Sequence, residues 1–133
     1  MSARKVLDSY GVIAFFENER GADLVAEEIK HARDREKTLL LSVVNWGEVY
    51  YTVLRAAGKP AAEEAMKTLD TLPIEVVPVD RELTRLAAEF KATRKMSYAD
   101  CFAAALAKLR KADLITGDKE FKEVEGEVKI IWL

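Results

Sequence analysis

The sequence has one cysteine, Cys101, and one histidine, His31. A single thiol cannot form an intramolecular disulfide, so a disulfide-stabilised scaffold and a zinc site built from Cys and His are both excluded. A Cys–His or Ser–His nucleophilic site is disfavoured as well, because His31 lies in a charged helical stretch that we expect to face solvent. Cys101 is expected to be a small buried hydrophobic residue.

Several other functional signals are missing. There is no GxGxxG pattern after the first predicted strand and no P-loop lysine, so nucleotide-cofactor binding has little support. The longest apolar run, from Cys101 to Ala107, is far shorter than the roughly 20 residues that span a bilayer. Asp8 interrupts any signal-peptide core, so we expect a cytoplasmic protein without a membrane partner. A net charge of −2 provides no global positive field for nucleic acid.

The sequence does contain a regular alternation of apolar runs and amphipathic stretches. Half of the 133 residues are hydrophobic and 33% are charged, as in a soluble globular domain. Alternation of strands and helices predicts an α/β protein with three layers, α/β/α, around a central parallel sheet of about five strands. The predicted strands are 5–8, 38–42, 74–77, 112–116 and 128–133.

Four acidic residues fall at the same edge of this predicted sheet. Asp8 ends the first strand, Asp118 follows the fourth, Glu48 is in the second turn after the second strand, and Asp100 opens the helix before the fourth. Parallel sheets of this kind bind ligands at the carboxyl ends of their strands. Clustered carboxylates repel one another unless they are protonated or neutralised by a cation. Hard oxygen ligands favour Mg²⁺ or Mn²⁺.

Each acid also has a simpler explanation when taken alone. Ser97-x-x-Asp100 fits a capping box, Glu48 could be an ordinary exposed helix residue, and Asp118 an ordinary turn residue. A receiver-like phosphotransfer domain would need an acid at the end of the third strand, but Asp80 is better interpreted as a helix N-cap. The shared position of four acids at one edge favours a joint role.

Four segments carry a family resemblance: 6–9, Val-Leu-Asp-Ser; 42–50, Ser-Val-Val-Asn-Trp-Gly-Glu-Val-Tyr; 97–107, from Ser97 through Asp100 to Ala107; and 114–121, Leu-Ile-Thr-Gly-Asp-Lys-Glu-Phe. In order and spacing they resemble the motifs of the PIN-domain family, and within it the VapC toxin ribonucleases of VapBC toxin–antitoxin systems. The resemblance covers nearly the whole chain, which implies a single PIN-like nuclease domain over 1–133. Many relatives have a further Asp two residues after the fourth acid. Glu120 stands there in this chain, and its metal role stays open.

The resemblance implies a metal-dependent endoribonuclease that hydrolyses phosphodiester bonds in RNA, possibly tRNA. It further implies a homodimer and a VapB-type antitoxin as partner. The alternative is a non-catalytic PIN-fold module that binds RNA or protein. The roles implied are Mg²⁺ or Mn²⁺ ligands for Asp8, Asp100 and Asp118, a ligand or water-orienting group for Glu48, and support of the ligands or contact with phosphate for Ser9 and Thr116.

Overall fold

A computed structural model describes residues 4–133 and shows one all-parallel, five-stranded sheet. The spatial order is β3-β2-β1-β4-β5, so the first strand in the chain is the central one. This confirms the predicted parallel sheet of about five strands. The strands are β1 Lys5–Leu7, β2 Leu39–Ser42, β3 Ile74–Val77, β4 Asp113–Thr116 and β5 Ile130–Trp132.

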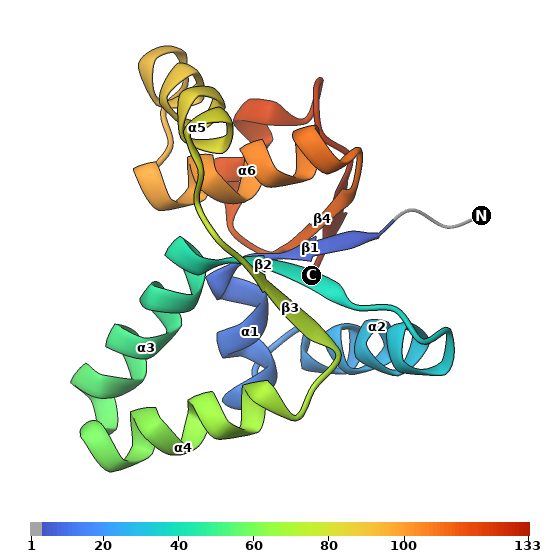
Figure 1. The fold of residues 1–133 in the computed structure, drawn as a ribbon, viewed down its shortest axis with the longest axis vertical. Helices are drawn as coiled ribbons and strands as arrows, with labels where there is room; N and C mark the ends of the chain where they lie inside the picture. Colours follow the sequence, from blue (N-terminus) through green and yellow to red (C-terminus); the bar gives the residue numbers. More distant parts are fainter. Residues whose placement is uncertain (1–3) are drawn as a thin grey trace.

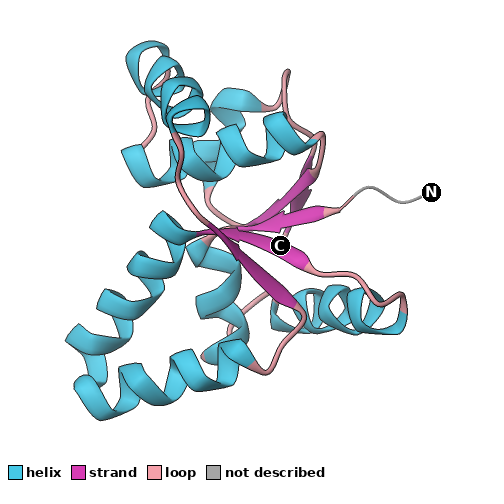
Figure 2. Cartoon of the chain, in the orientation of Figure 1, coloured by secondary structure: helices cyan, strands magenta, loops and turns pink. Residues whose placement is uncertain are grey.

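Helices cover both faces of the sheet, which gives the predicted three layers (Figures 1 and 2). One face carries α5 Arg81–Thr93, α6 Tyr98–Arg110 and the 3₁₀ helix η1 Lys119–Val124. The other face carries α1 Ser9–Phe16, α2 Ala22–Asp34, α3 Val43–Ala57 and α4 Lys59–Asp70. Adjacent strand residues alternate between the two cores: Val6 packs with α5 and α6, and Leu7 with α1 and α2.

Short polar side chains start the helices where the sequence predicts. The Asp80 carboxylate accepts a hydrogen bond from the Leu83 N–H at 2.8 Å, which confirms the predicted cap of α5. Ser42 caps α3 in the same way, through the Val44 N–H at 3.2 Å. The Ala-rich α6 is buried from Asp100 to Ala107, because small side chains let it lie close to the sheet. These caps set where each helix leaves the sheet edge.

The apolar side chains along α3 are buried only near its start. Val49 is fully buried, whereas Leu54 and Ala57 are exposed. The reason is that α3 and α4 form a hairpin that extends away from the sheet, so the far half of α3 has no sheet beneath it (Figure 1). Within residues 4–133, no helix has both the length and the apolar character needed to cross a bilayer.

Candidate active site

Asp8 lies at the carboxyl end of the central strand and is 1% exposed. It caps α1, since its Oδ1 accepts a hydrogen bond from the Gly11 N–H at 2.9 Å. Its Oδ2 accepts one from the Thr116 hydroxyl, across on β4, at 2.6 Å. The structure therefore joins two residues that the sequence analysis singled out separately, and it holds Asp8 under the site with both carboxylate oxygens engaged.

Asp100, Asp118 and Glu120 form a compact group at the same edge. One carboxylate oxygen from each of the three lies within 4.8 Å of the others. Asp100 comes from the first turn of α6 and is 6% exposed. Asp118 caps η1 by accepting the Glu120 N–H at 2.9 Å, and its own N–H donates to the Thr116 hydroxyl at 3.0 Å. Three acids from two elements thus point into one place.

Glu120 takes a part that the sequence pattern assigned to Asp100. Ser97 caps α6 and accepts the Asp100 N–H at 3.1 Å, but the reciprocal bond of a capping box is not made by Asp100. Instead the Ser97 N–H donates to Glu120 Oε1 at 3.0 Å. The capping box expected from Ser97-x-x-Asp100 is therefore only half formed within α6, and the Asp100 carboxyl is left for the acidic group.

Glu48 is held beside this group rather than inside it. Its Oε1 accepts hydrogen bonds from the Ser9 hydroxyl and from the Asn45 amide, both at 2.9 Å. The same Asn45 amide donates to the Ala99 carbonyl at 3.2 Å, so Asn45 links α3 to the start of α6. Sequence reasoning missed Asn45. Its position three residues before Glu48 on a helix was the available signal, because such residues are neighbours on the helix surface.

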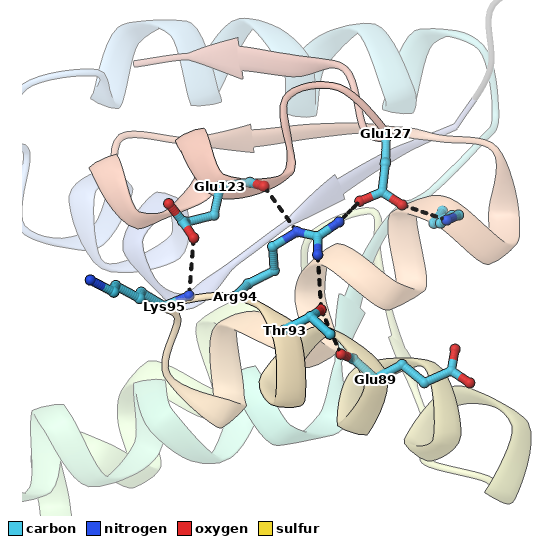
Figure 3. Close-up of polar contacts among 7 residues, drawn as sticks. Glu89, Thr93, Arg94, Lys95, Glu123 and Glu127 are labelled. Atoms are coloured by element: carbon cyan, nitrogen blue, oxygen red, sulfur yellow. Dashed lines mark hydrogen bonds and ion pairs between the residues drawn. The ribbon is translucent and has the colours of Figure 1, made fainter.

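The connection from α5 to α6 is fastened to the segment that carries Asp118 and Glu120 (Figure 3). Arg94 donates through Nε to the Glu123 carbonyl at 3.2 Å and pairs with Glu127. The Lys95 N–H donates to the Glu123 carboxylate at 3.0 Å. These bonds hold the N-terminal end of α6 against η1 and so keep Asp100 close to its two acidic neighbours.

Burial and mutual repulsion disturb the titration of these acids. Burial raises the pKa of Asp8 to about 7, although the hydrogen bonds from Thr116 and Gly11 act in the opposite direction. Burial, a hydrogen bond to Glu120 and the nearby charge of Asp118 raise the pKa of Asp100 to about 9. The hydrogen bond from Asp100 lowers the pKa of Glu120. Crowding of the carboxyl groups thus favours protonation within the Asp100–Glu120 pair when no cation is bound.

The acids line a pocket of about 630 Å³. Its wall holds five carboxylates and one cationic side chain, that of Arg20. An all-oxygen donor set with excess negative charge fits a hard divalent cation such as Mg²⁺ or Mn²⁺. A cation would also relieve the repulsion that adds to burial in raising the pKa of Asp100. The five carboxylates belong to Glu19, Glu48, Asp100, Asp118 and Glu120.

The family model described as PIN domain matches residues 5–127. VapBC2 from Rickettsia felis, bound to a promoter DNA fragment, has a chain with a TM-score of 0.76 at 15% identity, covering 96% of each chain. DNA-bound VapBC from Salmonella typhimurium has a chain with a TM-score of 0.73 at 17% sequence identity, and the match covers 97% of each chain. Mycobacterium tuberculosis VapC20, a sarcin–ricin loop cleaving toxin, has a TM-score of 0.70 at 18% sequence identity. The match covers 94% of this chain and 97% of that one. At these identities the likeness concerns the fold. No curated protein sequence gives a significant match.

Proposed function

The chain belongs to the PIN domain family, as its four acidic motifs predicted, and we propose that it is a metal-dependent endoribonuclease that serves as the toxin of a toxin–antitoxin pair. The observation that carries the proposal is the group of Asp100, Asp118 and Glu120 at the carboxyl edge of the sheet, with Asp8 buried beside it. A cluster of acids that is costly in charge repulsion suits a cation-dependent reaction on a phosphodiester.

Asp100, Asp118 and Glu120 would hold the metal, and Asp8 would contribute directly or through water. Glu120 joins the ligands predicted from the sequence because its carboxylate lies in the same group. When bound, Mg²⁺ or Mn²⁺ supplies charge neutralisation at the phosphate and a lower pKa for a water molecule. The ion's identity and number are part of the proposal.

The remaining side chains orient the reacting groups. Thr116 and the Gly11 N–H fix both oxygens of Asp8, so this carboxylate keeps one orientation. Ser9 and Asn45 hold one oxygen of Glu48. The other oxygen of Glu48, on the pocket wall, would accept a hydrogen bond from the attacking water and aim it at phosphorus.

The partners we propose are a structured RNA substrate, a VapB-type antitoxin and a second copy of the chain, in the cytoplasm. The support is that the solved structures described above are toxin–antitoxin complexes and a toxin that cleaves the sarcin–ricin loop. A non-catalytic module that binds RNA or protein is the alternative. The complete set of acids favours the enzyme, since a binding module has no need for carboxylates that repel RNA phosphates.

The deciding experiment incubates the purified chain, free of any antitoxin, with total RNA in Mg²⁺, in Mn²⁺ and in EDTA. We expect cleavage in the metals and none in EDTA. Asp100→Asn should abolish cleavage. Asp113→Asn, at the opposite end of β4, is the matched control and should cleave like the wild type. Cleavage that persists in EDTA or in Asp100→Asn would refute the proposed role of the acidic group.

A further inference from the structure

We propose that Tyr10 and Arg20 form an RNA-binding wall of this pocket, where a base of single-stranded RNA stacks on the Tyr10 ring and Arg20 holds a neighbouring phosphate. The inference rests on the proposed function and extends it, because it assigns how the pocket holds its substrate. Both residues line the pocket that contains Asp100 and Asp118. Neither belongs to the acidic motifs.

Tyr10 lies directly on the turn that presents Asp118. A Cβ atom added to Gly117 would be 2.4 Å from Tyr10 Cε1 and 2.8 Å from Cζ, closer than real Cβ contacts. Gly117 does not have a positive φ, so a side chain at this position would disturb the contact with Tyr10 rather than the backbone conformation. The absence of a side chain at Gly117 lets the ring rest next to the acids.

The Tyr10 ring is also available for contact. Its side chain belongs to the exposed large hydrophobic residues, at 43% exposure, although it comes from the first turn of a helix packed on the sheet. Among residues 4–133 no group hydrogen-bonds its hydroxyl. Exposed aromatic rings beside a phosphate-processing site suit unstacked RNA bases, because every base presents a π face.

Arg20 supplies a positive charge to a pocket wall that is otherwise acidic. It lies in the connection between α1 and α2 and, among residues 4–133, is the only basic side chain on a wall that carries five carboxylates. No ion pair or hydrogen bond of its guanidinium occurs in the part of the chain that the structure describes. RNA must bring phosphates past these carboxylates, and an Arg with unused donors is the side chain that can attract and orient them.

Tyr51 and Arg85 show what these residue types look like elsewhere on the surface. Tyr51 is equally exposed at 44%, but it is outside the pocket and Arg55 lies 4.8 Å from its ring centre. Arg85, on α5, is exposed and also outside the pocket. They are therefore matched controls for loss of an aromatic ring and loss of a positive charge away from the site.

The test measures binding separately from cleavage. A fluorescein-labelled single-stranded RNA of mixed sequence, about 12 nucleotides long, is titrated with protein in Ca²⁺ and followed by anisotropy. Tyr10→Ala should weaken binding by about 5- to 150-fold, the effect of losing one stacked base. Tyr10→Phe should bind like the wild type. Tyr10→Leu keeps an apolar side chain over Gly117 without a π face, so it should bind as weakly as Tyr10→Ala.

Arg20 is tested through salt dependence. Arg20→Gln should weaken binding and reduce the slope of log Kd against log salt by about 0.7, the value for one phosphate contact on a single strand. Arg20→Lys should restore the slope. Tyr51→Ala and Arg85→Gln should leave both affinity and slope unchanged. A change in fold alone would not lower the salt slope by the value of one phosphate contact, and Arg20→Lys would not reverse such a change.

The outcomes separate this inference from the proposed nuclease. A wild-type chain that binds RNA through Tyr10 but cleaves nothing in Mg²⁺ or Mn²⁺ supports the inference and refutes the nuclease. The inference is overturned if the wild type does not bind the RNA, if Tyr10→Leu binds like the wild type, or if Tyr51→Ala loses as much affinity. Melting temperatures identify any variant that fails to fold. The comparison of RNA affinity between Tyr10→Phe and Tyr10→Leu then decides whether the aromatic ring is needed.

Discussion

Asp8 and Asp80 have the same local role as helix caps, yet only Asp8 belongs to the candidate active site. Each caps a helix after a parallel strand, accepting the N–H of the third residue along, at 2.9 Å from Gly11 and 2.8 Å from Leu83. β1 is central, between β2 and β4, whereas β3 is at the edge of the sheet. Asp8 is buried and meets Thr116 from β4, while Asp80 is exposed. The neighbouring strands, rather than the cap, make Asp8 part of a site.

The largest expected effect of this difference is on catalysis. Asn caps a helix as well as Asp does, so Asp8→Asn and Asp80→Asn should both fold. Under Mg²⁺ or Mn²⁺, Asp8→Asn should cleave RNA at least about 100-fold more slowly, beyond the loss usual for residues that only support a metal ligand. Asp80→Asn should cleave like the wild type. Initial rates on one RNA measure this, and equal losses in both variants would remove the distinction.

The second effect is on metal-linked stability, which needs no RNA. Mn²⁺ at about a hundred times its dissociation constant should raise the free energy of unfolding of the wild type and Asp80→Asn by about 2.7 kcal/mol. Asp8→Asn and Asp118→Asn should show a much smaller rise at the same Mn²⁺ concentration, because the site loses a carboxylate. Urea denaturation with and without Mn²⁺ gives these values. If Mn²⁺ raised the free energy of unfolding of Asp8→Asn as much as that of the wild type, Asp8 would have no part in metal binding.

The third effect is on stability against pH without metal. Burial raises the pKa of Asp8 from 3.8 to about 7 in the folded chain. Between those values the folded state binds more protons than the unfolded state, so this residue lowers the free energy of unfolding as pH rises from about 4 to about 7.

Asp8→Asn removes this titration and should be more stable than the wild type by up to about 4 kcal/mol above about pH 8, since each pKa unit corresponds to about 1.4 kcal/mol. The two should converge below about pH 4, where the aspartic acid is protonated in both states. Urea denaturation across pH in EDTA measures the difference, with Asp80→Asn as the control. An Asp8→Asn variant less stable at every pH would contradict the pKa assigned to Asp8.

The smallest effect belongs to Asp80. Asp80→Ala removes the hydrogen bond to the Leu83 N–H and should lower the free energy of unfolding by about 1 kcal/mol. Asp80→Asn should keep the free energy of unfolding of the wild type, because Asn can accept the same hydrogen bond. Neither variant should change RNA cleavage. Thermal or urea unfolding checks the first statement and a cleavage assay the second. Loss of cleavage in a normally folded Asp80→Ala would extend the site to the edge of the sheet.

Much of the fold could be predicted because local patterns agree with tertiary packing. Ile74–Val77 is a strand with the predicted bounds, and Asp80 and Ser97 cap helices as expected. Short apolar runs and small polar caps are formed by residues close in sequence. Exposure along α3 could not be predicted, because the apolar spacing around Leu54 is the same whether or not another element covers it.

The site was predictable in position but not in composition. Asp8, Asp100 and Asp118 could be placed at one edge because parallel strands share their carboxyl ends. The role of Glu120 stayed open, since it meets Asp100 only through the course of η1 and the bond from the Ser97 N–H. Tyr10 carried no signal either, because its ring meets Gly117, 107 residues later, only in the folded chain.

By itself, the sequence determined the parallel sheet, the order of its elements and the edge at which the acids gather. When strands and helices alternate, each short connection restricts how one segment packs on the next, and this restriction involves only segments adjacent in the sequence. Only the tertiary structure decided that Asp8 is buried while Asp80 is exposed, that the Asp100 carboxylate lies beside that of Glu120, and that Tyr10 lies on Gly117. Burial and close contacts depend on which distant segments pack together, and no short stretch of sequence encodes them.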